Sequence, residues 1–196
     1  MPCALSVARA RPIAACAVAA ASRALPWALS VAIGLAALVA ATPAVAAPSA
    51  PAFTVKRLDG SGTFDSRSVL GKKVLVVRFQ ASWCAVCVEE APGIERLWQR
   101  YKSRGVEVVA VQVQDTAAEA KRFLTAHGAT YPAGLDPHLA IADRFGFKGT
   151  PYTVVINKRG EMVARIHGRA DEARLAKVLD PLVKPPPTKR PPARLQ

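Results

Sequence analysis

Two nearly continuous apolar runs lie at the centre of the chain, at residues 72–80 (KKVLVVRFQ) and 106–114 (VEVVAVQVQ). Such runs are typical of strands that are buried on both faces, as in a sheet with parallel neighbours. The segment between them, 84–104, repeats its apolar side chains at helical spacing, on a stripe formed by Ile94, Leu97, Trp98 and Tyr101. The pattern therefore predicts a strand, a helix that Gly105 ends, and a second strand.

Shorter patterns flank this centre. Residues 53–57 and 63–64 are β-like runs separated by glycines, which predicts an N-terminal hairpin. After the second central strand we expect two helices, a β-hairpin and a closing helix, at 117–127, 139–145, 150–168 and 171–183. Strands separated by helices predict right-handed crossovers. The fold class is therefore α/β, a central mixed β-sheet flanked by helices, which we expect on both of its faces.

The start of the chain differs from this body in composition. No acidic residue precedes Asp59, and three arginines precede an uncharged, mostly apolar stretch from Trp27 to Ala50. A basic start, an apolar middle and small residues before a cleavage point near Ala46 are typical of an export signal. An uncleaved membrane anchor and an organelle transit peptide remain alternative interpretations of residues 1–46.

The end of the chain and its charge add little about function. Residues 184–196 are proline-rich and basic, which predicts a disordered, extended tail and leaves 47–183 as the folded domain. The chain has a formal net charge of +13, and its predicted domain carries 20 lysines and arginines against 14 acidic residues. These basic residues are scattered and form no basic-aromatic stripe, which argues against nucleic-acid binding. An anionic membrane surface is the better match for this charge.

Two cysteines, Cys84 and Cys87, remain when residues 1–46 are removed, and both fall where the first central strand gives way to a helix. A disulfide that closes so short a loop constrains the unfolded chain little, so a purely structural bridge explains it poorly. The first turn of a helix carries free N–H groups and partial positive charge, which stabilises a thiolate at Cys84. Cys87 lies one turn further on and could resolve a mixed disulfide, so the spacing predicts a redox-active pair.

A metal site is the competing interpretation of the two thiols. Structural zinc needs four ligands, and the predicted domain adds only three histidines, none within three positions of another: His127, His138 and His167. Copper(I) accepts two thiolates and one further ligand, so a copper-binding metallochaperone is the alternative function. A thiol peroxidase is a third candidate, which the Trp-Cys-x-x-Cys context does not favour.

Four blocks of the sequence resemble the thioredoxin superfamily, in particular its exported, TlpA- and ResA-like thiol–disulfide oxidoreductases. The blocks are PAFTVKRLDG, SWCAVCVEEAP, residues 131–163 and the closing helix, which together cover about residues 51–182. The resemblance implies a thioredoxin-like fold in which the N-terminal β-hairpin is an extension. It also implies that no bound cofactor is needed, because Cys84–Cys87 would itself be the redox-active disulfide.

The resemblance gives individual positions a role. Cys84 would be the exposed catalytic nucleophile and Cys87 the catalytic resolving thiol, with Trp83 beside them as a substrate contact or as a packing residue. Pro151 would be a cis-proline that faces the disulfide. A cis bond there would leave the backbone of Thr150 free to pair with an extended substrate peptide.

Three further positions refine the expected site. Glu90 matches the acidic residue of the family pattern and would exchange a proton with the resolving thiol, and Pro92 would kink the helix. Arg78 departs from thioredoxin, which has an acid in this buried strand, and a buried arginine is costly unless it is paired. In one interpretation Arg78 pairs with Glu90 beneath the cysteines, lowers the pKa of Glu90 and favours the thiolate. In the other, its side chain reaches the strand edge.

The sequence thus predicts an enzyme, a thiol–disulfide oxidoreductase that reduces disulfides in exported proteins. The absence of a histidine at Ala85-Val86 favours a reductant over an oxidant. The resemblance implies cytochrome c maturation or cytochrome oxidase assembly as the pathway. The expected partners are a disulfide-bearing exported protein and a membrane thiol electron donor. We expect a periplasmic monomer, either free or anchored to the inner membrane by its N-terminal segment.

Overall fold

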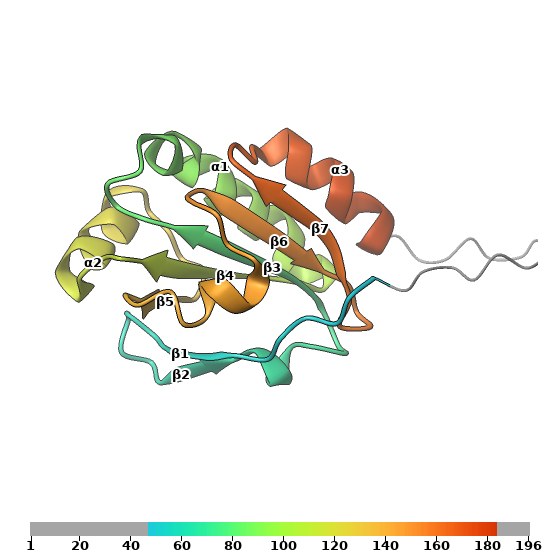
Figure 1. The fold of residues 1–196 in the computed structure, drawn as a ribbon. Coiled ribbons are helices and arrows are strands. Elements are labelled where there is room, and N and C mark those ends of the chain that lie inside the picture. The colour runs from blue at the N-terminus through green and yellow to red at the C-terminus, as the bar shows by residue number, and fades with distance from the viewer. Residues whose placement is uncertain (1–46, 184–196) are drawn as a thin grey trace, which may run out of the picture. The chain divides into compact units, whose positions relative to one another are not determined.

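The computed structural model describes residues 47–183, and the segments interpreted as a signal or anchor (1–46) and a tail (184–196) lie outside the described residues. The two apolar runs form the central strands β3 (Val74–Gln80) and β4 (Val106–Val113). They pair in parallel, from Val74 opposite Val106 to Gln80 opposite Gln112. Both lie inside a five-stranded mixed sheet of order β5-β4-β3-β6-β7 (Figure 1).

The remaining strands include one that the sequence pattern did not predict. Strands β6 (Tyr152–Ile156) and β7 (Met162–His167) form the expected hairpin, and β6 runs antiparallel to β3. Strand β5 (Ala133–Asp136) pairs in parallel with β4, although glycine is unfavourable in a strand. Gly134 is required there because a Cβ at this position would lie 2.4 Å from the Cβ of Val55.

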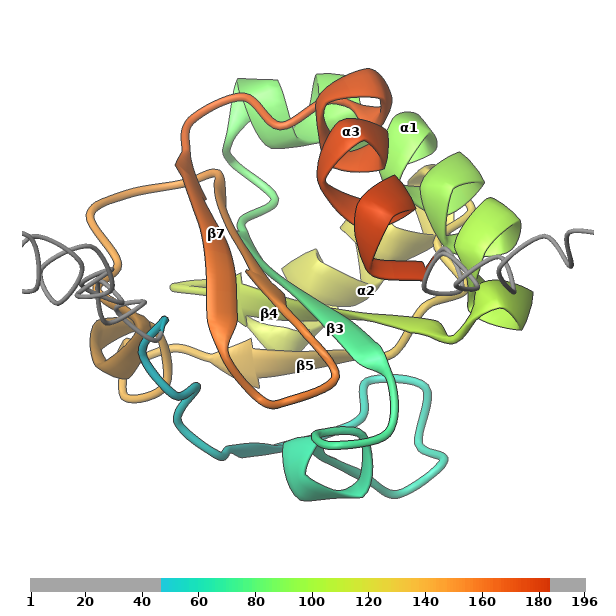
Figure 2. The same ribbon diagram turned by 90° about the vertical axis from the view of Figure 1, so that its right-hand side faces the viewer.

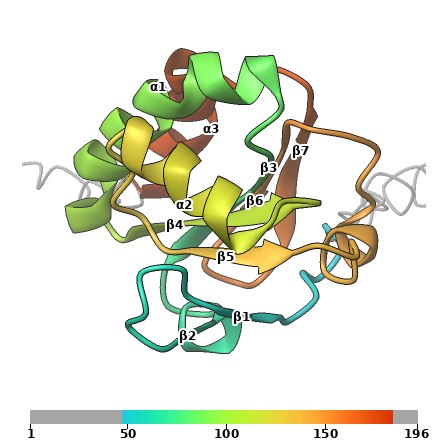
Figure 3. The ribbon, with the colours of Figure 1, turned by 90° about the vertical axis from the view of Figure 1, so that its left-hand side faces the viewer.

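The three α-helices lie on one side of the sheet, and the N-terminal hairpin lies on the other (Figures 1 and 3). The helices are α1 (Ala85–Tyr101), α2 (Ala117–Ala126) and α3 (Glu172–Val183). The expectation of helices on both faces holds only for the short 3₁₀ helix η3 (Ala142–Phe145), whose Phe145 packs against Phe53 on the hairpin side. The chain moves in one direction across the sheet from β3 through β4 to β5, so right-handed crossovers bring both connecting helices to the same face.

The opposite face is covered by the predicted hairpin, formed by β1 (Thr54–Lys56) and β2 (Thr63–Asp65). Short 3₁₀ helices follow β2, α1 and β5, at η1 (Ser66–Ser68), η2 (Lys102–Arg104) and η3 (Ala142–Phe145). The helix expected at 139–145 is therefore only the short η3. Leu139 has a φ of 60°, which an α-helix cannot accommodate.

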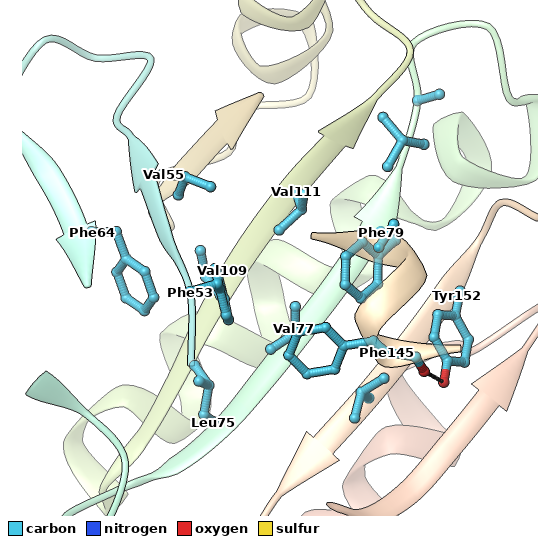
Figure 4. Close-up of a cluster of buried hydrophobic side chains, with 14 of the residues drawn as sticks. Phe53, Val55, Phe64, Leu75, Val77, Phe79, Val109, Val111, Phe145 and Tyr152 are labelled. Carbon is cyan, nitrogen blue, oxygen red and sulfur yellow. Dashed lines mark hydrogen bonds between the residues drawn. The ribbon is translucent and has the colours of Figure 1, made fainter. Parts of the chain in front are cut away.

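Two apolar layers enclose the sheet. On the hairpin side the layer is rich in aromatic rings, including Phe53, Phe64, Phe79, Phe145 and Tyr152 (Figure 4). On the helix side, α1 and α3 lie alongside each other (Figure 2), and Glu172 of α3 forms ion pairs with Arg96 and Arg100 of α1. Every residue of β3 is buried between these layers, and its carboxyl end leads into the two cysteines.

Candidate active site

The two cysteines form a disulfide at the N-terminus of α1, with their Cα atoms 5.2 Å apart. After β3 the chain makes a tight turn, in which the amide of Cys84 donates to the carbonyl of Ala81 at 3.2 Å. Cys84 then caps the helix, and its Sγ accepts a hydrogen bond from the amide of Cys87 at 3.1 Å. Backbone N–H groups at a helix start stabilise a negative charge, so this position favours a thiolate at Cys84 in the reduced protein.

The exposure of the two sulfur-bearing residues differs less than expected. Cys87 is fully buried and Cys84 is 7% exposed, so the expectation of an exposed Cys84 is wrong for the disulfide form. Cys84 is enclosed because it caps the helix and is bonded to a buried partner. It is nevertheless the more accessible of the two, which is the order that an attacking and a resolving cysteine require.

The large apolar residues that flank the two cysteines in sequence are exposed. Trp83 is 61% exposed and Val88 is 39% exposed, which places both among the most exposed large hydrophobic residues of the described part of the chain. Trp83 is therefore not a core packing residue, which was the alternative to a substrate contact. Exposed apolar groups beside a reactive bond are suited to contact with another polypeptide.

The Thr150–Pro151 peptide bond is cis, as expected. Pro151 directly precedes Tyr152, which pairs with Phe79 near the end of β3. Pro151 therefore lies at the same edge of the sheet as the turn that carries Cys84. Within residues 47–183 the backbone amide and carbonyl of Thr150 make no hydrogen bond, whereas the carbonyl of Pro151 accepts from the amide of Gly168 at 2.9 Å. The backbone of Thr150 is thus open to an extended peptide, as β-augmentation requires.

Arg78 and Glu90 form a buried ion pair on the helix side of the sheet, with 2.8 Å between Nη2 and Oε2. The side chain of Arg78 is fully buried, so the alternative in which it reaches the strand edge is wrong. Its remaining donors are also used, because Nε donates to the Oε1 of Gln80 at 3.1 Å and Nη1 donates to the Oγ1 of Thr153 at 3.2 Å. The second oxygen of Glu90, Oε1, accepts from the amide of Ala170 at 2.7 Å.

This pair connects the redox helix to the rest of the domain. Glu90 is three residues after Cys87 on α1, and both are buried, so the carboxylate lies on the sulfur-bearing face of the helix. Pro92 lies inside α1, as the sequence predicted. Because every polar atom of the Arg78–Glu90 pair has a partner, the structure avoids most of the cost of burying two charges.

Sequence reasoning missed a second buried carboxylate near the site. Asp115 follows β4 and is 3% exposed, and its oxygens accept hydrogen bonds from both the amide and the hydroxyl of Ser82. A signal was present in the sequence: Gln80 and Gln112 are polar positions near the carboxyl ends of two mostly apolar strands, and the register places them side by side. The two glutamines therefore mark a polar layer at the carboxyl ends of β3 and β4.

The donors for a metal ion are not gathered together. Within residues 47–183 no group of three or more histidine, cysteine or acidic side chains could hold an ion. His167 instead stacks on Tyr152, and His127 packs against Phe123. Burial raises the pKa of Tyr152, whose hydroxyl donates to the carbonyl of Phe145, so Tyr152 is a neutral packing residue beside Pro151. The metallochaperone alternative gains no support from this arrangement.

A disulfide at the N-terminus of a helix, at the sheet edge where a cis-proline precedes the neighbouring strand β6, is the redox centre of a thiol–disulfide oxidoreductase of thioredoxin-like fold. Comparison with known proteins agrees and gives the family. The AhpC/TSA family model matches residues 47–165. The chain belongs to the AhpC/TSA family.

Individual relatives carry consistent names. The chain is 33% identical over 141 residues to the thiol:disulfide interchange protein HelX of Rhodobacter capsulatus, which covers 71% of this chain and 78% of that one. It is 30% identical over 133 residues to the thiol-disulfide oxidoreductase ResA of Halalkalibacterium halodurans, which covers 68% and 74%. A solved thiol:disulfide interchange protein from Chlorobium tepidum, at 25% identity, superposes with a TM-score of 0.65 over 70% of this chain and 97% of that one.

Proposed function

We propose that this protein reduces disulfide bonds in exported proteins, in the manner of cytochrome c maturation or oxidase assembly. The observation that carries the proposal is the hydrogen bond from the Cys87 amide to the Cys84 sulfur at the start of α1. It prepares one sulfur of the pair as a thiolate nucleophile and leaves the other buried behind it. The names of the ResA and HelX relatives support the same activity.

The reaction transfers two electrons through the cysteines alone, and we propose that no bound cofactor takes part. The Cys84 thiolate attacks a substrate disulfide, which forms a mixed disulfide and releases one substrate thiolate. Cys87 then gives its proton to Glu90 and attacks the sulfur of Cys84, which releases the second substrate sulfur as a thiolate that takes the proton from Glu90. The substrate disulfide has become a dithiol and the enzyme dithiol has become the Cys84–Cys87 disulfide. A membrane thiol donor would return the enzyme to its dithiol form.

Substrate contact is assigned to the edge of the sheet that carries the disulfide. The exposed ring of Trp83 supplies apolar surface, and the unpaired backbone of Thr150 supplies hydrogen bonds to an extended peptide. Such recognition is largely independent of the substrate side chains. It suits a reductant that meets its target cysteines in an unfolded or extended chain.

The location is also a proposal. Residues 1–46 would carry the protein to the periplasm as a cleaved signal or as an inner-membrane anchor. Within the described residues, none of the helices combines the length and apolar composition that a membrane crossing requires. We expect the domain to act as a monomer.

A substrate trap tests this function. The full chain is used with Cys3→Ser and Cys16→Ser as background, so that no other thiol is present. A peptide containing an oxidised Cys-x-x-Cys-His sequence, the haem attachment pattern of c-type cytochromes, is mixed with the reduced Cys87→Ser variant. We expect a stable mixed disulfide on Cys84, detected by mass spectrometry, whereas the unaltered cysteine pair releases reduced peptide.

The Cys84→Ser variant is the matched control. Its remaining thiol is fully buried, so we expect it to capture little or no peptide. Equal capture by both variants would show that the assigned order of attack is wrong. If the intact pair reduces neither this peptide nor insulin, and Cys87→Ser traps nothing, the oxidoreductase proposal fails.

A further inference from the structure

Asp115 is bonded directly to the turn that carries the nucleophilic cysteine. Its Oδ2 accepts from the amide of Ser82 at 2.9 Å, and its Oδ1 accepts from the hydroxyl of Ser82 at 2.8 Å. Ser82 is the second residue of the turn that the Cys84-to-Ala81 hydrogen bond closes. A buried carboxylate from the β4–α2 loop therefore holds the backbone two residues before Cys84.

The Asp115 carboxylate also lies at one end of a buried network of side-chain hydrogen bonds. When the amide of Gln112 is oriented to satisfy its neighbours, its nitrogen donates to Asp115 Oδ2 at 3.3 Å and its oxygen accepts from Gln80 Nε2 at 3.1 Å. Gln80 in turn accepts from Arg78, which pairs with Glu90. A continuous set of hydrogen bonds thus runs from the α1 carboxylate to the carboxylate beside the turn.

Glu89 and Glu90, the carboxylates of α1 nearest the cysteines in sequence, are each paired with an arginine. Arg78 neutralises Glu90 on the helix side, and Arg169 neutralises Glu89 at the surface of α1. By contrast, Asp115 forms no ion pair with any cationic side chain of residues 47–183, and its partners there are neutral donors.

The other charged groups near Ser82 belong to α2 and the residue that follows it. Glu119, Arg122 and His127 line, with Ser82 and Val88, a pocket of about 260 Å³. Glu119 is committed to the capping box of α2, where it accepts from Thr116. These groups lie at the surface side of the turn, whereas Asp115 is bonded to it from the interior.

We propose that Asp115 is the positioning residue of the redox turn, and that its charge makes the cysteine pair a stronger reductant. The inference rests on the proposed function and deepens it. Ser82 and Cys84 are two residues apart, so their Cα atoms are separated by at most about 7 Å. The Asp115 carboxylate is bonded to the Ser82 amide at 2.9 Å, so it lies within about 12 Å of the Cys84 Cα. Its negative charge disfavours the Cys84 thiolate and leaves the neutral disulfide unaffected. The dithiol form is thereby disfavoured, and its electrons pass more readily to a substrate.

The test compares Asp115→Asn with Asp136→Asn, both in the full-length protein. Asparagine keeps the shape of the side chain and removes its charge. Asp136 is a matched control, because it is also buried and also holds a loop, accepting from the amides of Ile141 and Ala142 at 2.9 and 2.8 Å. Thiolate absorbance gives the pKa of Cys84, and equilibration with reduced and oxidised glutathione gives the reduction potential.

We expect Asp115→Asn to lower the pKa of Cys84 by about one unit. The glutathione equilibrium should move up to about tenfold toward the dithiol, which corresponds to about 30 mV. Asp136→Asn should lower stability and leave both quantities unchanged. An unchanged pKa and potential in Asp115→Asn would overturn the inference, as would equal shifts in both variants, because the effect would then be a general loss of rigidity.

A measurement on the unaltered protein covers the case in which Asp115→Asn does not fold. In the reduced protein the ¹³C resonance of the Asp115 carboxylate should shift as Cys84 ionises, because the coupling between two charges is reciprocal. A resonance that stays constant through this titration would also overturn the inference. If the wild-type pair fails to reduce insulin, the proposed function falls, while the acidity measurements still decide the role of Asp115.

Discussion

The two faces of strand β3 differ in composition although they belong to the same seven residues. On the hairpin face, Leu75, Val77 and Phe79 point into a layer of apolar and aromatic side chains (Figure 4). On the helix face, Val74 and Val76 are also apolar, but Arg78 and Gln80 replace them at the carboxyl end. The polar residues are therefore confined to the end of one face, the end that leads to the disulfide.

We infer from this difference that the hairpin face of β3 mainly stabilises the fold, whereas the polar end of the helix face affects the chemistry of the cysteines. The aromatic layer stabilises the sheet by burial of apolar area, which is insensitive to charge. The polar layer carries the charges and hydrogen bonds that reach α1 and the redox turn, and each of its members requires its partners. Mutations in the two layers should therefore cost similar stability but differ in their effect on the cysteines.

The largest effect is expected from Arg78→Ala. It leaves Glu90 buried without its ion-pair partner, so we expect a loss of about 3–5 kcal/mol in the free energy of unfolding. Loss of the cation beneath the cysteines should also raise the pKa of Cys84 and slow disulfide exchange at neutral pH. Denaturant unfolding measures the first effect, and thiolate absorbance with insulin reduction measures the second.

The double variant Arg78→Met with Glu90→Leu separates charge from packing. Apolar replacement of both members of a buried pair is often neutral for stability, so much of the stability lost in Arg78→Ala should return. The exchange rate should remain low, because the proton acceptor assigned to Cys87 is absent. If Arg78→Ala left both the pKa of Cys84 and the exchange rate unchanged, the ion pair would have no part in the chemistry.

A comparable loss of stability with no change in the chemistry is expected from Phe53→Ala. The Phe53 ring lies 5.7 Å from that of Phe145 and 6.0 Å from that of Phe64, between the hairpin and η3. Its removal leaves a cavity that should cost about 3–5 kcal/mol. Under conditions where the variant is folded, its Cys84 pKa and exchange rate should equal those of the wild type. A changed pKa would mean that the aromatic layer also sets the chemistry of the site.

The sequence predicted the parts of this architecture that depend on local pattern. The apolar runs predicted β3 and β4, and the helical spacing predicted α1. A charged residue in a buried strand suggested the Arg78–Glu90 pair as one of two alternatives. The cis state of Pro151 and the proton-exchange role proposed for Glu90 came from family resemblance, since most X-Pro bonds are trans. Local pattern and resemblance were together enough to locate the two cysteines at the start of α1.

The sequence did not reveal features that depend on which strands become neighbours. Strand β5 was missed because Gly134 looks unfavourable until the close approach of Val55 is known. Asp115 was missed for a similar reason, because it is 33 positions from Ser82 in sequence and only the parallel register of β3 and β4 brings them together. The lack of exposure of Cys84 follows from the helix cap and the disulfide bond, which residue type does not predict.

The smallest effect, and the sharpest comparison, comes from two adjacent residues of β6 that point to opposite faces of the sheet. Thr153 accepts from Nη1 of Arg78 at 3.2 Å, and Val154 belongs to the hairpin-side layer. Thr153→Val leaves one buried donor unpaired, and Val154→Thr buries an unpaired hydroxyl, so each should cost about 1–3 kcal/mol in unfolding free energy. Only Thr153→Val should alter the Cys84 pKa, by less than Arg78→Ala does, because the ion pair itself remains. Equal Cys84 pKa values in these two variants would show that the hydrogen bond to Thr153 contributes to stability alone. The part of the polar layer that affects the cysteines would then be Arg78 and the residues between it and the cysteines.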